Sequence, residues 1–204
     1  MPNTSSTLGR RPHWRLPVTE LLVLCIGNAA RSVMAGFMLE YLNEHREDKE
    51  HGEDTKINPR PDLHIVTAGT HTIDGQPMGL RTRNALSTLP EMAHATFTGH
   101  RSRQVYEADL SRADLVVVME ADHVRYVRRV FPLVAPRTAA IRRLCADLPP
   151  APPALGDRLA ALNLAEATLS DDDDVIDPAG HDAQAYEACV AELWGLCQQL
   201  ITLL

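Results

Sequence analysis

Cys25 and Arg31 are the two residues of this chain whose types and spacing could carry chemistry. They lie in the segment LCIGNAARS, in which the arginine follows the cysteine by six positions. A thiolate is a strong nucleophile, and the planar fork of a guanidinium can bind two oxygens of a phosphate-like anion. The pair therefore indicates covalent chemistry on an oxyanion. The spacing alone is weak support, because the chain is rich in arginine and buried, inert cysteines are common.

The elements on either side of this segment strengthen the interpretation. Residues 21–25, LLVLC, form a continuous apolar run that predicts a buried parallel strand ending at the cysteine. From Ser32 onward apolar residues recur at helical spacing, so a helix is predicted directly after a turn at Gly27 and Asn28. Both turn residues tolerate left-handed backbone angles. We expect the turn to gather its amides into an anion site at the helix N-terminus, with the thiol at its centre and the Ser32 hydroxyl bonded to it.

Strands and helices alternate along the rest of the chain. This alternation predicts a parallel α/β sheet. Further strands are predicted at 63–69 and 114–120, and helices at 78–89, 122–130 and 154–169, with a short strand and helix within 137–148. Apolar residues from Tyr186 to Leu204 step by three and four positions, which predicts a last helix with one buried stripe.

The remaining segments have no periodic pattern. Residues 1–19 are interpreted as a flexible leader, and 20–204 as a single domain with insertions at about 45–61 and 132–174. Within the second insertion, the proline-rich stretch 149–153 predicts a stiff linker, and the acidic run 171–174 predicts a solvated loop.

The composition narrows the class of protein. The chain has 204 residues, of which 45% are hydrophobic and only 4% aromatic, so we expect one domain with an aliphatic core. Its 20 basic and 27 acidic residues give a net charge of −7, which lacks the cationic footprint of a nucleic-acid binder. Its four scattered cysteines fit neither a zinc motif nor a disulfide scaffold. No apolar run reaches the roughly 20 residues of a membrane helix. We therefore expect a soluble, cytoplasmic protein with neither membrane nor nucleic acid as a partner.

Four motifs follow one another along the chain: LLVLCIGNAARSVMAGFML, IVTAGT, GHRSRQVYEADLSRADLVVVME and VIDPAG. In this order they resemble the low-molecular-weight protein-tyrosine phosphatase family and the arsenate reductases built on the same fold. The resemblance covers residues 20–44, 62–131 and 175–204. It implies an α/β three-layer sandwich with a central four-stranded parallel sheet and a phosphate loop after the first strand.

The resemblance also implies roles for individual residues. Cys25 would attack phosphorus, Arg31 would bind the equatorial oxygens, and Asp177 would protonate the leaving phenolate. The phosphate-binding residues would be Ile26, Gly27, Asn28, Ala29, Ala30, Arg31 and Ser32, with Asn28 holding the shape of the loop and Ser32 stabilising the thiolate. The reaction would pass through a phospho-cysteine and need no metal or other cofactor. The expected partners are a phosphotyrosine protein or small aryl phosphate, and a phosphate, sulfate or other oxyanion in the loop.

The sequence departs from the family pattern at two places. Ala30 stands where many members have a second cysteine, so protection of Cys25 by a neighbouring disulfide is not expected. Ala179 and Gly180 follow the Asp-Pro pair where many members have aromatic residues. This departure weakens the expectation of phosphotyrosine preference, and it makes His71 and Ile73 candidates for a substrate wall.

Other residues that could carry chemistry have structural interpretations. Cys189 and Cys197 fall on or beside the apolar stripe of the last helix, which favours core packing, and Cys145 has no assigned partner. His100 is expected to bond near the loop. Without the resemblance, Asp177 would be ambiguous, because Asp-Pro is a common turn pair.

Two alternatives to a phosphatase stay open. An arsenate reductase would use the same Cys25, Arg31 and Asp177 and a relay of thiols. The usual relay needs two further cysteines in a mobile segment, whereas those of this chain are predicted on a packed helix; a relay through a small external thiol needs no second cysteine. A non-enzymatic phosphate sensor is the third interpretation, and it would need no nucleophile, arginine and acid together.

Overall fold

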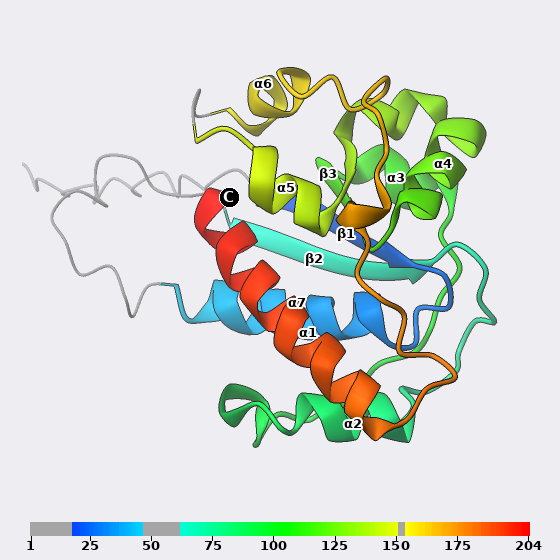
Figure 1. The fold of residues 1–204 in the computed structure, drawn as a ribbon, viewed down its shortest axis with the longest axis vertical. Helices are drawn as coiled ribbons and strands as arrows, with labels where there is room; N and C mark the ends of the chain where they lie inside the picture. Colours follow the sequence, from blue (N-terminus) through cyan, green and yellow to red (C-terminus); the bar gives the residue numbers. More distant parts are fainter. Residues whose placement is uncertain (1–17, 47–61, 151–153) are drawn as a thin grey trace, which may run out of the picture.

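The computed structural model describes residues 18–46, 62–150 and 154–204. Their centre is a parallel sheet of β1 (Val18–Cys25), β2 (Asp62–Gly69), β3 (Leu115–Val118) and β4 (Thr138–Ala140), in the order β2-β1-β3-β4. Figure 1 labels the first three of these strands. The predicted four-stranded parallel sheet is confirmed. β1 begins two residues inside the expected leader, and the rest of that leader lies outside the described residues, as do most of the 45–61 segment and part of the 149–153 linker.

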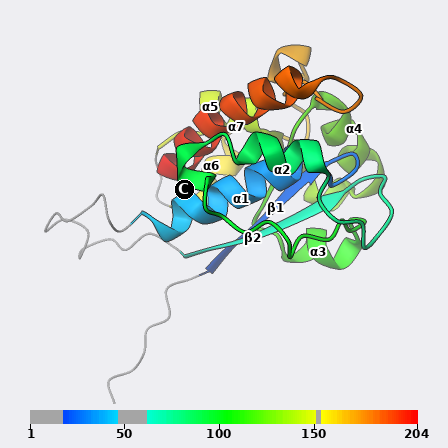
Figure 2. The same cartoon turned by 90° about the horizontal axis from the view of Figure 1, so that it is seen from below.

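The sheet is covered on both faces, which makes three layers. Side chains of β1 alternate between two apolar clusters, with Leu21 and Val23 in one and Leu22 and Leu24 in the other. The first cluster packs under α1 (Arg31–Glu44), α2 (Leu80–Leu86), α5 (Ile141–Asp147) and α7 (Ala183–Leu203). The second packs under α3 (Glu107–Arg112) and α4 (Ala121–Val130). Figure 2 shows α3 on the opposite side of β1 and β2 from α1 and α2.

Several predicted elements differ in length from those in the structure. α2 is shorter than the predicted helix 78–89, and the predicted helix 154–169 is reduced to α6 (Leu155–Ala160). Asn163 follows with a φ of 46°, a left-handed conformation that cannot continue a right-handed helix. The six-residue α3 was not predicted, because Leu110 is its one buried apolar residue and gives no periodicity.

Short 3-10 segments complete the chain: η3 (Pro90–Met92), η4 (Pro132–Arg137) and η5 (Asp171–Asp173), the last within the acidic run. The stretch 132–174 contributes β4 and α5 to the central sheet and its cover, as well as the added helix α6.

None of the helices in the described ranges is long and apolar enough to cross a membrane.

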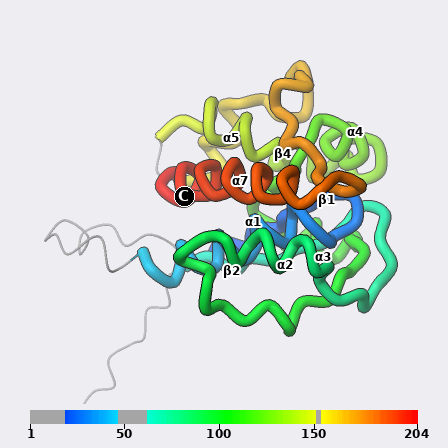
Figure 3. Tube along the Cα trace, turned by 60° about the horizontal axis from the view of Figure 1, so that its bottom comes forward, coloured from blue at the N-terminus to red at the C-terminus, as the bar shows by residue number. Residues whose placement is uncertain are grey.

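Parallel strands end at the same edge of the sheet, and here that edge gathers three segments. Cys25 pairs with Gly69 at the ends of β1 and β2, and Leu24 pairs with Val118 of β3. The segment leading into α7 reaches the same edge, because the amide of Val175 donates to the carbonyl of Met119 at 2.8 Å (orange in Figure 3). The cysteine therefore ends its strand where segments distant in sequence meet.

Candidate oxyanion site at the end of the first strand

Hydrogen bonds to its carbonyl oxygens hold the loop between β1 and α1 in place. Every carbonyl oxygen from Cys25 to Ala30 accepts a hydrogen bond, at 2.7–3.1 Å. The donors are the amides of Met34, Thr70 and His71, the hydroxyls of Thr72 and Thr82, and Nε2 of His100. In a trans peptide the N–H points opposite to the C=O. The amides of the loop must therefore point inward, toward a common centre in front of the α1 N-terminus, which is the geometry of an anion site.

Asn28 fixes the shape of this loop from within. Its φ of 46° is the left-handed value expected for it, and among the loop residues it alone has a positive φ, so Gly27 adopts an ordinary conformation. Its side-chain amide donates to Ser32 Oγ at 3.1 Å and to Thr67 Oγ1 at 3.0 Å, while its Oδ1 accepts from the amide of Arg103 at 3.0 Å. The Asn28 side chain thus ties the loop to α1, to β2 and to the segment before α3.

Gly69 allows β2 to lie against the loop. A methyl group added there would come within 2.6 Å of the Ile26 carbonyl oxygen and 3.0 Å of the Asn28 amide nitrogen. We expect Gly69→Ala to push the loop out of shape, lowering the unfolding free energy by about 1–3 kcal/mol and weakening phosphate binding by at least about tenfold. Thermal unfolding and calorimetric titration with inorganic phosphate measure the two effects.

Gly99→Ala is the matched control, because a methyl group at Gly99 would meet nothing within 4 Å. It should leave phosphate affinity unchanged. Wild-type affinity in Gly69→Ala would mean that the loop does not need this close approach.

Cys25 lies at the floor of the loop, 3% exposed, with its Sγ 3.0 Å from Ser32 Oγ. The expected contact with Ser32 is therefore present. Burial raises the pKa of Cys145 to about 11 and that of Cys189 to about 12, and it raises the pKa of the fully buried Cys197 further. These three thiols are protonated near neutral pH, and each packs in the apolar core.

Arg31 is buried and holds three groups. Nη1 donates to Glu120 Oε2 at 2.8 Å and to the Val175 carbonyl at 3.0 Å, and Nη2 donates to Asp177 Oδ2 at 2.8 Å. Burial alone would lower the pKa of Arg31, but the hydrogen bond to Glu120 and the charges of Asp177 and Glu120 outweigh it and raise that pKa. The structure thus brings together Cys25, Arg31 and Asp177, the three residues singled out from the sequence.

Glu120 and His123 also belong to this cluster, although neither was predicted from the sequence. Glu120 follows β3 and His123 lies in the first turn of α4, with its Nε2 3.3 Å from Glu120 Oε1. An acidic residue at the end of a strand, facing a predicted anion-binding arginine, is the signal that could have pointed to Glu120. His123 gave no signal, because a lone histidine in a helix is usually structural.

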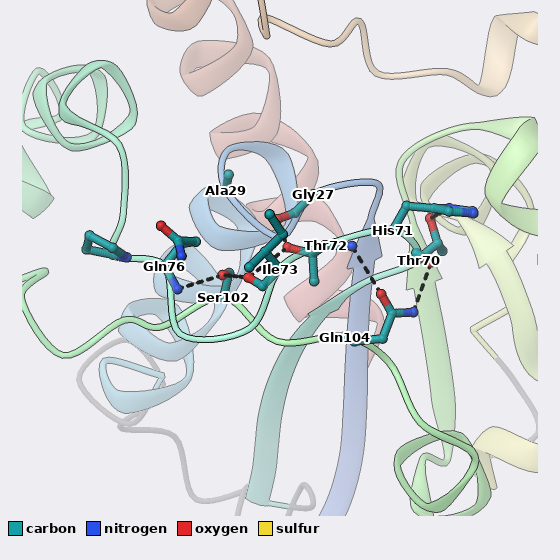
Figure 4. Close-up of a pocket in the computed structure, with 10 residues that line it drawn as sticks. Gly27, Ala29, Thr70, His71, Thr72, Ile73, Gln76, Ser102 and Gln104 are labelled. Atoms are coloured by element: carbon teal, nitrogen blue, oxygen red, sulfur yellow. Dashed lines mark hydrogen bonds between the residues drawn. The ribbon is translucent and has the colours of Figure 1, made fainter.

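A cavity of about 690 Å³ lies beside the loop, lined by Gly27 and Ala29 on one side and by residues within 70–77 on the other (Figure 4). Gln104 bridges the carbonyl of Thr70 and the amide of Thr72, and Ser102 donates to the carbonyl of Ile73. These hydrogen bonds therefore fix the backbone of residues 70–73 in the cavity wall.

The two candidate wall residues lie differently. The Ile73 side chain is 74% exposed beside the loop, whereas the His71 ring points away from it and packs edge-on against Tyr126, with ring centroids 5.7 Å apart (Figure 4). Two more isoleucines are exposed: Ile26, which follows Cys25 in the loop, and Ile176, which precedes Asp177. The exposed apolar side chains on these segments are thus aliphatic.

Within residues 18–46, 62–150 and 154–204, no group of three or more His, Cys, Asp or Glu side chains is placed to hold a metal ion.

Comparisons with known proteins give one family. The sequence model described as low molecular weight phosphotyrosine protein phosphatase matches residues 20–149. A curated relative from Ralstonia nicotianae, the probable low molecular weight protein-tyrosine-phosphatase EpsP, is 26% identical over 129 residues, which cover 62% of this chain and 71% of the relative.

Solved structures share the fold. The YwlE arginine phosphatase from Geobacillus stearothermophilus superposes with a TM-score of 0.62 at 21% identity, covering 90% of this chain and 91% of its own. The low molecular weight protein tyrosine phosphatase from T. tengcongensis gives 0.64 at 22% identity, covering 91% and 99%. The expected α/β architecture, with Cys25 at the end of the first strand, is confirmed.

Proposed function

Because this chain belongs to the low molecular weight phosphotyrosine protein phosphatase family, and is therefore a hydrolase, we propose that it cleaves aryl phosphate monoesters, phosphotyrosine among them, through a phospho-cysteine. The observation that carries the proposal is that every carbonyl oxygen from Cys25 to Ala30 accepts a hydrogen bond, which supports a loop whose amides face the Cys25 thiol. We infer that residues 20–204 form a single domain, and the hydrogen bond between Arg31 and Asp177, 146 positions apart, supports this.

The first step forms an S–P bond and breaks the P–O bond of the ester. The Cys25 thiolate attacks phosphorus while the loop amides of residues 26–32 and Arg31 hold the three equatorial oxygens. Asp177 gives its proton to the departing phenolate oxygen. Negative charge that develops on the oxygens meets amide dipoles that are already oriented, so little reorganisation is needed.

The second step reverses these roles. Water attacks phosphorus, Asp177 takes its proton, and the S–P bond breaks to release inorganic phosphate and restore the thiolate. Ser32 stabilises that thiolate through the 3.0 Å contact. Asp177 bonds to Arg31 Nη2, so an entering oxyanion competes for this nitrogen and frees the carboxyl group to face the leaving oxygen.

Two assays test the proposal. Wild-type protein should release phosphate from p-nitrophenyl phosphate at mildly acidic pH without added metal, and rapid denaturation at alkaline pH during turnover should trap one phosphoryl group on the Cys25 peptide. Protein that hydrolyses no phosphate ester but consumes arsenate with a small thiol donor would replace the proposal with the arsenate reductase alternative. The burial of Cys145, Cys189 and Cys197 gives that alternative no support from a second protein thiol.

The substrate wall is part of the same proposal. Ile73 lies exposed beside the loop, so we expect Ile73→Ala to raise the Michaelis constant for aryl phosphates about threefold to tenfold, with kcat little changed. His71→Ala should have a smaller effect, because its ring packs on Tyr126 instead. Steady-state kinetics with p-nitrophenyl phosphate and a phosphotyrosine peptide measure both.

Two further results would test the proposed substrate wall and substrate class. Unchanged Michaelis constants in both variants would show that neither residue contacts the leaving group. Phosphoarginine is a useful second substrate, because a solved structure of the same fold is an arginine phosphatase. Faster turnover of phosphoarginine than of aryl phosphates would contradict the proposed substrate class.

A further inference from the structure

His123 is a buried ionisable side chain beside the Arg31–Glu120 ion pair, and the proposed reaction gives it no role. Its relative exposure is 2%, and it lies one turn after Glu120 in α4. Glu120 bridges its two neighbours: Oε2 accepts from Arg31 at 2.8 Å, and Oε1 lies 3.3 Å from the imidazole Nε2. Glu120 thus connects His123 to Arg31, which lies at the end of the oxyanion loop.

The imidazole is neutral in this setting. Burial, and next the positive charge of Arg31, lower the pKa of His123 to about 4, although Asp177 and Asp122 oppose the shift. A neutral imidazole carries one N–H, and the carboxylate oxygen that faces Nε2 favours the proton on that nitrogen. Such a ring can donate to Glu120 without cancelling the charge that Glu120 presents to Arg31. A protonated ring would compete with the arginine for the same carboxylate.

Within the described ranges neither ring nitrogen has an aligned hydrogen-bond partner. A buried polar group left in this state costs stability, so its retention needs an explanation. Hydrogen bonds that serve a ligand site are often long or misaligned in the free protein and tighten when the ligand binds. The distance of 3.3 Å between His123 Nε2 and Glu120 Oε1 is already within hydrogen-bond range, so a change of angle alone would complete such a bond.

The first turn of α4 leaves Glu120 free for this role. Glu120 occupies the N-cap position, yet its side chain makes no capping bond. Instead Asp174 accepts from the amide of Ala121 at 2.7 Å and takes over the capping function. The Glu120 carboxylate can therefore turn toward Arg31 and His123.

We propose that His123 is a positioning residue for the oxyanion site, which donates from Nε2 to Glu120 when an oxyanion fills the loop and so fixes the guanidinium of Arg31. The inference rests on the proposed function only in that Arg31 binds the oxyanion. It extends the site to α4, beyond the loop and the acid.

The test measures phosphate binding directly, so that it does not depend on turnover. His123→Leu keeps the volume and removes the donor, and it should raise the dissociation constant for inorganic phosphate about tenfold in calorimetric titration. His123→Gln can place an amide N–H where Nε2 lies, and it should stay within about threefold of wild type. A space-filling role predicts no such rescue.

Two comparisons separate positioning from general destabilisation. Val127→Ala removes buried volume from the same helix, and it should lower the melting temperature without changing phosphate affinity. Adding His123→Leu to Glu120→Gln should change the phosphate dissociation constant by less than about twofold, because the histidine acts through the glutamate.

The inference would be overturned by wild-type phosphate affinity in His123→Leu, by equal losses in the Leu and Gln variants, or by additive effects with Glu120→Gln. Its fate is separable from that of the phosphatase proposal. A wild-type protein that binds phosphate and shows the expected pattern of variants, yet hydrolyses no ester, would overturn the proposed function alone. A wild-type protein that binds no phosphate would overturn both.

Discussion

Replacing Cys25 with serine is expected to abolish hydrolysis of aryl phosphates, with a fall in kcat of at least about a thousandfold. The serine hydroxyl stays protonated at assay pH and is a poor nucleophile, and the other three cysteines pack in the apolar core. The amides and Arg31 are unchanged, so phosphate should still bind with nearly wild-type affinity. Initial rates with p-nitrophenyl phosphate and calorimetric titration with inorganic phosphate measure the two quantities.

Cys145→Ser provides the matched control. Burial raises the pKa of Cys145 to about 11, and its Sγ donates to the carbonyl of Leu196 at 3.3 Å, a bond that a serine hydroxyl can keep. This variant should turn over like wild type. If Cys145→Ser lost activity while Cys25→Ser kept it, the nucleophile would have been misassigned.

Asp177→Ala is expected to lower kcat by about a hundredfold to ten-thousandfold, the usual contribution of a general acid. The loss should be largest for phenyl phosphate, whose leaving oxygen needs the proton, and smallest for nitrophenyl esters, whose phenolate leaves unaided. The same variant removes a competitor for Arg31 Nη2, so inorganic phosphate should bind at least as tightly as to wild type. Kinetics with a series of substituted phenyl phosphates measure the dependence.

Asp171→Ala controls for the loss of a carboxylate from the same segment. Asp171 is exposed in the acidic run, and its side chain has no hydrogen-bond or ion-pair partner within the described residues. Its removal should leave kcat unchanged for every ester. An equal loss for good and poor leaving groups in Asp177→Ala would argue that the residue shapes the site and does not donate a proton.

The sequence predicted the elements whose apolar pattern extends over many residues. β1 has a continuous apolar run and α7 has an apolar stripe, and in each case burial explains the pattern. The six-residue α3 and the end of α6 could not be predicted, because α3 buries one apolar side chain and α6 stops where the backbone turns left-handed near Asn163. Short elements owe their form to tertiary contacts that a local pattern does not contain.

The site residues likewise differ in how far the local sequence identifies them. Cys25 and Arg31 are adjacent to one turn, so their spacing and neighbours identify them, whereas Asp177 needed a resemblance because an Asp-Pro pair has no chemistry of its own. The groups that hold the loop, such as Thr72 and His100, come from segments far along the chain and act through single hydrogen bonds to carbonyl oxygens. His123 gave no signal in the sequence, and the contact of Glu120 with Arg31 depends on the pairing of β3 with β1, which the sequence does not show.

The hydrogen bond between Arg31 and Asp177 spans 146 positions of sequence. This separation implies an order in which the parts of the site form during folding. On the ribosome the cysteine and the arginine emerge early, and the carboxylate emerges late. Contacts between residues this distant close large loops, whose entropic cost delays them in folding. A partly folded chain in which residues 67–103 already hold the loop would then bind phosphate without hydrolysing esters. Recovery of turnover after denaturation should lag behind recovery of phosphate binding, which makes enzymatic activity a reporter of the final folding step.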